Sequence, residues 1–520
     1  DGFVAFDVDL TPTAPVMLDE VSVGIPVRYE VARFFHVDGG WRELRWGAVA
    51  RRAEFPALAS ERYYYWVGDD DVGLSWMTDR TAHWQASDSL RTGFHRQVGQ
   101  FQGFFQPWSH RAELREPFRI RLALEATPTR PEYERPLREF TSHNTPPERF
   151  AQPLPKGKDT ILEMSLQGKF NFPPYPEHAE RIADWIKGYV KRGIRVLGYH
   201  YISQEVSTAH YHQHWGDWEA TMPPILHPRI GGERGTAWSF SCFNSSWSDY
   251  YCHIVDRTTS EFDTDGIYLD GIMQERMCER PLAHGPDCDQ TWPLFASRAH
   301  IKKLLYLVQQ NRGSEAFLWG HSSDNKLAPF AGVMDLLYEG ENYGGAIPYK
   351  HLTTDVMRAQ FGRQFGPRTV YIPQLTREDI PPRRLLGMLA LHGVECPPRG
   401  MTHATADTLV RPLWETLDSF PDSTARFVPY FEQQIFEDAN GLPVSVYIHP
   451  DGGRLLLVLA NQSARAVTYQ LQYQPRQYRP STTITDIRER LVGQRVRAEG
   501  DHIDLTLNPW DFRLLDVQLD

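Results

Sequence analysis

Apolar and polar positions alternate in different ways along this chain, and each change of period marks a boundary. Up to about residue 126 the period is two, as in Val21 to Val31 and Phe118 to Ala126. That period is typical of half-buried strands, and Gly, Pro and Asp turns separate the runs. We therefore predict an N-terminal β-sandwich over residues 1–126.

Residues 127–157 show no period and are rich in Pro and Arg. We predict that they form a linker or an arm that wraps a neighbouring domain.

From residue 158 to about 430, short apolar runs alternate with amphipathic segments. Predicted strands include Thr160 to Leu166, Thr236 to Ser241 and Gly266 to Asp270, and a helix is expected over His178 to Lys191. Repeated strand–helix units imply a parallel sheet, and about eight of them fit a (β/α)₈ barrel.

Residues 431–520 return to strands, and we predict a second sandwich there. The predicted fold class is therefore α/β, a central TIM-like barrel between two β-sandwich domains, which suits the length of 520 residues.

Two apolar runs end on carboxylates. Gly266 to Asp270 stops at an aspartate, and Leu336 to Tyr338 leads into Glu339 and Glu341. Catalytic groups of (β/α)₈ barrels lie at such carboxyl ends of strands. Most glycosidases use two carboxyl groups for catalysis, so we predict Asp270 as nucleophile and Glu339 or Glu341 as acid/base. Because Glu339 and Glu341 are two positions apart, an extended strand would point both to one side.

Other polar or aromatic positions at strand ends could form a sugar subsite together with the loop after Asp270. The predicted substrate-binding residues are Glu163, His200, Tyr201, Tyr268, Arg276, His284, Trp319, His321 and Gln374.

The net charge of −11 argues against a nucleic-acid partner, since phosphate binding needs clustered Lys and Arg. No apolar run is long enough to span a bilayer. No G-x-G-x-x-G, P-loop or G-x-S-x-G motif follows a strand, which argues against nucleotide-binding proteins and α/β-hydrolases. The acidic turn Asp69 to Asp71 fits either a calcium loop or, more simply, a solvated turn.

The five cysteines leave alternatives open. Cys278 and Cys288 could form a disulfide in an oxidising compartment, or could bind zinc with His284, although the spacing fits no standard zinc pattern. The alternating histidines His210, His212 and His214 could also hold a metal, but such a run is more often a polar loop. We predict neither a metal nor a cofactor.

A resemblance to known protein families adds to the glycosidase prediction. Tyr65 to Trp76, with the pattern W-x-G-D-x-x-x-G-L-x-W, resembles a signature of bacterial proteins described as similar to glycoside hydrolase family 123. The strand ending at Asp270, the loop from Cys278 to Gly285 and the strand Tyr338 to Glu341 resemble the same group. The domain order is similar to that of the α-N-acetylgalactosaminidases of families 101 and 129, whose Asp nucleophile and Glu acid/base would map onto Asp270 and Glu339 or Glu341. Family 123 enzymes use an adjacent Asp-Glu pair, whereas Gly271 follows Asp270 here, so we expect direct attack by Asp270.

The sequence thus predicts a retaining, exo-acting glycoside hydrolase for an α-linked galactose- or N-acetylgalactosamine-type sugar. The alternatives are a carbohydrate-binding protein without catalysis and a polysaccharide lyase. We expect a carbohydrate partner, no nucleic acid or membrane partner and a possible homo-oligomer. The expected location is periplasmic or secreted, in a bacterium, after removal of a signal peptide.

Overall fold

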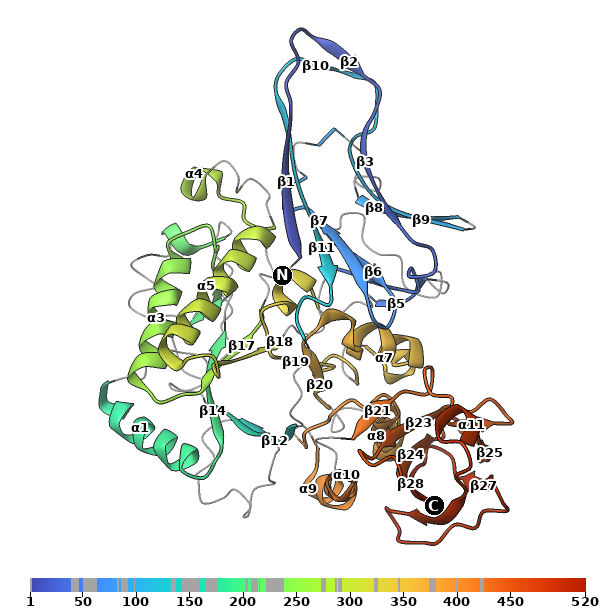
Figure 1. Ribbon diagram of the computed structural model, residues 1–520. Helices are drawn as coiled ribbons and strands as arrows, with labels where there is room; N and C mark the ends of the chain where they lie inside the picture. Colours follow the sequence, from blue (N-terminus) through green and yellow to red (C-terminus); the bar gives the residue numbers. More distant parts are fainter. Residues whose placement is uncertain are drawn as a thin grey trace.

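The structure is a computed structural model of the chain (Figure 1). It describes residues 2–38, 46–49, 63–81, 84–85, 92–97, 99–131, 137–142, 159–164, 176–201, 204–206, 214, 216–220, 238–272, 277–285, 288, 292–321, 326–344, 347–373, 380–398, 401–420 and 425–520. Among these residues, no helix is both long and apolar enough to cross a membrane.

The N-terminal region is built from antiparallel sheets, as the period-two pattern predicts. One sheet has the order β1-β11-β7-β6-β4-β5 and a second the order β3-β9-β8, while β2 and β10 pair separately. Large apolar side chains such as Trp76, Phe101 and Ile120 fill the space between them. The strands are β1 (Phe3–Leu10), β2 (Val16–Leu18), β3 (Val21–Val27), β4 (Phe34–Val37), β5 (Trp46–Ala48), β6 (Tyr64–Gly68), β7 (Gly73–Met77), β8 (Thr92–Gln97), β9 (Gln100–Trp108), β10 (Ala112–Leu114) and β11 (Phe118–Thr127).

The middle of the chain forms a seven-stranded sheet in which each neighbouring pair is parallel. Its strands, in spatial and chain order, are β12 (Leu137–Ser142), β13 (Asp159–Met164), β14 (Arg195–Tyr201), β17 (Gly266–Asp270), β18 (Phe317–His321), β19 (Leu336–Glu339) and β20 (Arg368–Tyr371). They are short and apolar because both faces are covered. Leu269 and Leu318 belong to the large core shared with the helices, whereas Tyr268 and Trp319 belong to a second cluster on the other face.

Helices connect these strands and cover one side of the sheet (Figure 1). The α-helices of this region are α1 (Pro176–Val190), α3 (Trp247–Glu261), α4 (Pro281–His284), α5 (Leu294–Arg312), α6 (Ala328–Ala331), α7 (Thr354–Phe361), α8 (Pro382–Leu391), α9 (His403–Thr405) and α10 (Arg411–Ser419). Single turns of 3₁₀ helix, η5 (Tyr349–His351) and η6 (Arg363–Phe365), flank α7, and a π-helical turn, η7 (Ala406–Val410), joins α9 to α10.

The two edges of the parallel sheet approach one residue, Glu395. Its backbone bridges Val370 of β20 in parallel, and its carbonyl accepts from the Tyr371 amide at 2.8 Å. Its Oε1 accepts from the Leu137 amide of β12 at 3.0 Å. The segment around Glu395 therefore contacts both edge strands.

The C-terminal region is again antiparallel, with a five-stranded sheet β21-β23-β24-β28-β26 and a three-stranded sheet β22-β25-β27 over a shared apolar core. Its elements are β21 (Arg426–Val428), β22 (Phe436–Asp438), β23 (Val444–Ile448), β24 (Arg454–Ala460), β25 (Val467–Tyr473), α11 (Pro475–Tyr478), β26 (Ile484–Glu489), β27 (His502–Leu507) and β28 (Phe512–Leu519). The strand β21 begins five residues before the predicted boundary at 431.

Two predictions about the middle region need correction. Residues 127–157 were predicted to form a linker or a wrapping arm. Thr129 and Arg130 do contact Phe365 and Asp335 of the middle region, as an arm would, but Leu137–Ser142 forms β12, an edge strand of the parallel sheet. It is short and flanked by Pro and Arg, which hides its period. Thr236 to Ser241 was expected in the same sheet, yet its described strand, β16 (Trp238–Phe240), pairs antiparallel with β15 (Gln204–Val206) outside that sheet.

The acidic turn between β6 and β7 forms ion pairs with the middle region of the chain. Asp70 forms a two-pronged ion pair with Arg358 of α7, with N···O distances of 2.8 and 2.5 Å, and Asp71 pairs with Arg363 at 2.8 Å. Asp69 accepts from the amides of Asp71 and Val72 and so shapes the turn. The turn therefore contacts the middle region rather than being only solvated.

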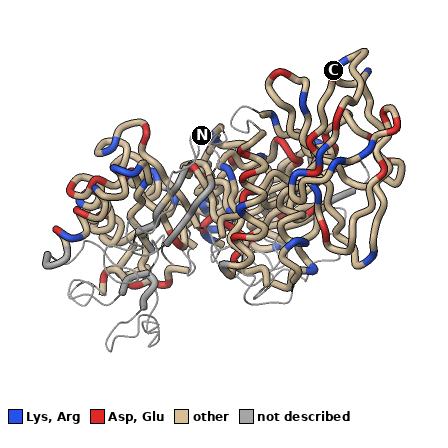
Figure 2. Tube along the Cα trace, turned by 90° about the horizontal axis from the view of Figure 1, so that it is seen from below, with Lys and Arg blue, Asp and Glu red and all other residues tan. Residues whose placement is uncertain are grey.

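Charge is distributed along the whole chain. Figure 2 shows Lys and Arg interspersed with Asp and Glu on the described trace. The prediction of no nucleic-acid partner rests on the sequence and is not tested by this distribution.

Candidate active site

Asp270 is the last residue of β17, where the chain turns through Gly271 with φ of 59°. Side chains alternate along a strand, so Asp270 points to the same face as Tyr268. That face carries the aromatic cluster of the parallel sheet. The Asp270 side chain is 18% exposed, so it combines burial with access to solvent.

Two neighbouring strands hold the Asp270 carboxylate. The Tyr199 hydroxyl on β14 donates to Oδ2, and Nδ1 of His321 on β18 lies 3.0 Å from Oδ1. The register explains the contact with His321, because Asp270 pairs directly with His321 across the two strands. Both oxygens of Asp270 are therefore engaged by proton donors.

His321 stands between two carboxylates. Its Nδ1 faces Asp270, and its Nε2 lies 3.3 Å from Oε2 of Glu341. Burial alone would lower the pKa of His321, but the charge and hydrogen bond of Asp270 and the charges of Glu341 and Glu339 raise it to about 9. A pKa of about 9 keeps a proton on both ring nitrogens of His321 at neutral pH, so that the ring can donate toward Asp270 and toward Glu341.

Aromatic rings form the floor below these groups. Tyr199 stacks on Tyr268 with a centroid separation of 5.4 Å, and Trp319 contacts Tyr268 at 6.0 Å and Tyr338 at 5.5 Å. Tyr268 and Trp319 are 1% and 0% exposed, so they pack under the site and are not presented to solvent. Both were predicted to bind substrate, which stays a prediction; in the structure both rings are buried in the aromatic cluster.

Glu339 and Glu341 do not share one side as an extended strand would require. The strand β19 ends at Glu339, and Gly340 follows with φ of 96°. A Cβ at Gly340 would lie 2.6 Å from the Tyr371 ring, so only glycine fits there. Glu339 is fully buried, whereas the Glu341 side chain is 36% exposed. Glu341 is thus the more accessible partner for a substrate.

His200 and His284 are placed away from this group. His200 is fully buried on the helix side of β14, where it contacts the Tyr251 ring of α3 at 5.8 Å, and burial lowers its pKa to about 3. His284 lies among cysteines, with Nδ1 3.0 Å from Cys278 Sγ, and its Nε2 contacts the Asp217 carbonyl. Neither ring is free to bind a sugar here, since strand alternation turns His200 outward and the cysteine cluster engages His284.

Four predicted site residues are not placed by the structure. Arg276 and Gln374 lie outside the described residues, and so do the side chains of Glu163 and Tyr201. Conversely, the sequence reasoning missed Tyr199 and Tyr338. Strand alternation could have found both, because each lies two positions after a leucine of the same cluster, Tyr199 after Leu197 and Tyr338 after Leu336.

No family model matches the chain, and no curated protein matches it. Among solved structures, the α-galactosidase AgaA of family GH36 from Geobacillus stearothermophilus is similar with a TM-score of 0.50 and 10% identity, covering 95% of this chain and 76% of that one. The galactosidase domain of the α-galactosidase-sucrose kinase AgaSK has a TM-score of 0.51 and 9% identity, covering 97% and 71%. An α-amylase from Geobacillus thermoleovorans has a TM-score of 0.47 and 13% identity, covering 75% and 99%.

The likeness to the two galactosidases shows the fold. The structural neighbours are glycoside hydrolases at low identity, and the chain shares the overall arrangement of the two galactosidases over nearly its full length. The resemblance to families 123, 101 and 129 stays a prediction.

Proposed function

We propose that this chain is a glycoside hydrolase whose catalytic pair is Asp270 and Glu341, on a (β/α)₈ barrel closed through the segment around Glu395. The observation that carries the proposal is the Asp270–His321–Glu341 group, at 3.0 and 3.3 Å, at the carboxyl ends of neighbouring parallel strands. Its place in the fold and the fold's likeness to galactosidases support the same conclusion.

Each carboxylate has a distinct role in this proposal. Asp270 accepts from the Tyr199 hydroxyl and lies against the His321 ring, and these two contacts fix its orientation, which suits a nucleophile. It forms a bond to the anomeric carbon while the glycosidic C–O bond breaks and Glu341 gives its proton to the leaving oxygen. Glu341 then takes a proton from water, and that water releases the sugar from Asp270.

The spacing of the pair bears on stereochemistry. Retaining enzymes hold their carboxyl groups ~5–5.5 Å apart, and inverting enzymes ~6.5–9.5 Å. The His321 ring stands between Asp270 and Glu341. Retention therefore requires Glu341, which follows the positive-φ Gly340, to move toward the bound sugar. We keep retention as the proposal because the domain order resembles that of families 101 and 129, whose Asp nucleophile would map onto Asp270.

The proposed substrate is an α-linked galactose- or N-acetylgalactosamine-type sugar at the end of a glycan. Two observations support this class: the predicted domain order, which is similar to that of the α-N-acetylgalactosaminidases, and the likeness in fold to α-galactosidases.

A panel of aryl α- and β-glycosides tests the proposal. Wild type should release the aryl group from an α-galactoside or α-N-acetylgalactosaminide, and proton NMR of the first product should show the α-anomer. A β-anomer would overturn retention but keep the hydrolase. No release from aryl glycosides or from longer glycans, with sugar binding intact, would favour the binding-protein alternative, and an unsaturated product absorbing in the ultraviolet would favour a lyase.

A further inference from the structure

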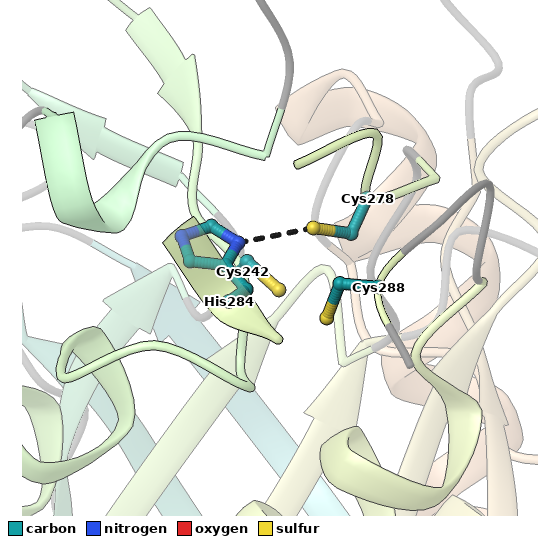
Figure 3. Close-up of side chains that lie close together, drawn as sticks. All are labelled: Cys242, Cys278, His284 and Cys288. Carbon is teal, nitrogen blue, oxygen red and sulfur yellow. Dashed lines mark hydrogen bonds between the residues drawn. The ribbon is translucent and has the colours of Figure 1, made fainter. Parts of the chain in front are cut away.

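Four metal-ligating side chains meet in one buried cluster outside the carboxylate group. Figure 3 shows Cys242, Cys278, His284 and Cys288 turned toward a common centre. One ligand atom of each lies within 4.8 Å of all the others. The three cysteines are fully buried.

The cluster brings together two separate parts of the chain. Cys242 follows β16 and donates its amide to Trp218 at 2.8 Å. Cys278 and His284 lie in the connection that begins after Asp270, and Cys288 follows with its amide bonded to Gly285 at 2.9 Å. The spacing C-x₅-H-x₃-C with a distant cysteine is not a standard zinc pattern. Only the fold therefore reveals the fourth ligand, Cys242.

The groups around the cluster orient its ligands. The Nε2 of His284 contacts the Asp217 carbonyl, which selects the tautomer with a proton on Nε2 and leaves the Nδ1 lone pair facing Cys278 Sγ at 3.0 Å. The Asn244 amide donates to Cys288 Sγ at 3.1 Å, as a donor to a thiolate would. A carbonyl behind a histidine ligand and an amide behind a thiolate are typical outer-shell partners of bound metals.

We propose that Cys242, Cys278, His284 and Cys288 bind one Zn²⁺ as a structural site. Three thiolates and one imidazole form a Cys₃His set, which favours tetrahedral zinc over hard cations such as Ca²⁺ or Mg²⁺. A disulfide would join two of the three sulfurs, leave the third unpaired and give His284 no role. The four protein ligands close the coordination sphere, so the ion takes no part in chemistry on substrate.

The site would fasten the connection that leaves Asp270. Residues 277–288 are joined by the metal to the segment around Cys242, and Glu279 also donates its amide to Ala220 at 2.9 Å. Zinc would thus hold together two segments that lie far apart in the sequence.

Metal analysis of the full chain, purified without chelators under reducing conditions, tests this proposal. We expect close to one zinc per chain in wild type and in Cys252→Ser, a control that removes a half-buried cysteine outside the cluster. Cys288→Ser should carry less than a tenth of that zinc. His284→Cys, which offers a Cys₄ set, should retain it and so separates ligand loss from misfolding.

Cobalt gives a second readout that does not depend on activity. Reconstitution with Co²⁺ should give the intense visible bands of a tetrahedral thiolate site in wild type and Cys252→Ser, but not in Cys288→Ser. Folded wild type that holds no zinc after anaerobic reconstitution would overturn the proposal. So would an intact mass showing a disulfide between two of these cysteines in the reduced preparation, or zinc retained in full by Cys288→Ser.

Discussion

At the scale of single residues, His321 decides the charge state of the site. It lies between Asp270 and Glu341, and its pKa is raised to about 9. Because the folded-state pKa exceeds the unfolded value of about 6.5, the stabilisation is fully present below pH 6.5 and is lost as pH rises through about 9.

The first prediction follows from that shift. Between pH 6 and pH 10 the unfolding free energy of wild type should fall by on the order of 3 kcal/mol because of this group. The unfolding free energy of His321→Gln should not show this fall. Urea unfolding of both proteins across this range measures the difference. Parallel pH profiles for the two would contradict the raised pKa.

The second prediction separates the two glutamates. Glu341→Gln should slow hydrolysis by about 10²–10⁴-fold for substrates with poor leaving groups, because a general acid contributes that much. Activated aryl glycosides need little proton donation and should be affected far less. Glu339→Gln serves as the matched variant, and its expected loss does not depend on the leaving group. The reverse pattern would make Glu339 the acid/base.

At the scale of secondary-structure elements, the turn between β6 and β7 joins two domains. Asp70 and Arg358 are only 12% and 17% exposed in their side chains, whereas Asp71 and Arg363 are 60% and 46% exposed. Removing one partner of a buried pair leaves an uncompensated charge, while exposed pairs contribute little.

The third prediction uses this contrast. Asp70→Asn should destabilise the protein by about 3 kcal/mol, and Asp71→Asn by less than about 1 kcal/mol. Thermal or urea unfolding of the two variants beside wild type measures both values. Equal destabilisation by the two substitutions would show that the buried Asp70–Arg358 ion pair does not hold this turn in place.

Strand ends were predictable from sequence where an apolar run stops at a carboxylate. That signal located the end of β17 at Asp270 and the end of β19 at Glu339. It failed for β12, which is too short and too Pro-flanked to show a period. It also failed for Tyr199, since a tyrosine inside an apolar strand reads as core. Cys242 could not be joined to Cys278 without the fold, because the sequence separates them and gives no metal spacing.

At the scale of the whole molecule, the N-terminal domain supports the segment that carries Glu341. Trp46 of β5 donates its indole N–H to the Tyr343 hydroxyl at 2.7 Å, and the Tyr343 amide bonds back to Gly340 at 3.2 Å. Tyr64 further accepts from the Ala328 amide at 3.0 Å. These hydrogen bonds attach the N-terminal domain to the connection after β19 and to the start of α6.

The fourth prediction tests this attachment. Trp46→Phe removes the hydrogen bond and should lower kcat by about 10-fold, since small misplacements of a catalytic group are costly. Trp76→Phe, in the core of the same domain, is the matched control and should leave kcat unchanged. If the two folded variants had equal kcat values, the N-terminal domain would contribute to stability and not to catalysis.

The central claim is that Asp270 is the nucleophile of a retaining glycoside hydrolase, and covalent capture tests it most directly. A galactose-configured cyclophellitol aziridine should label wild type once per chain, and peptide mass spectrometry should place the label on Asp270. Asp270→Asn should remain unlabelled while circular dichroism shows a native fold. A label on Glu339 or Glu341 with Asp270 unmodified, or labelling undiminished in Asp270→Asn, would contradict the account.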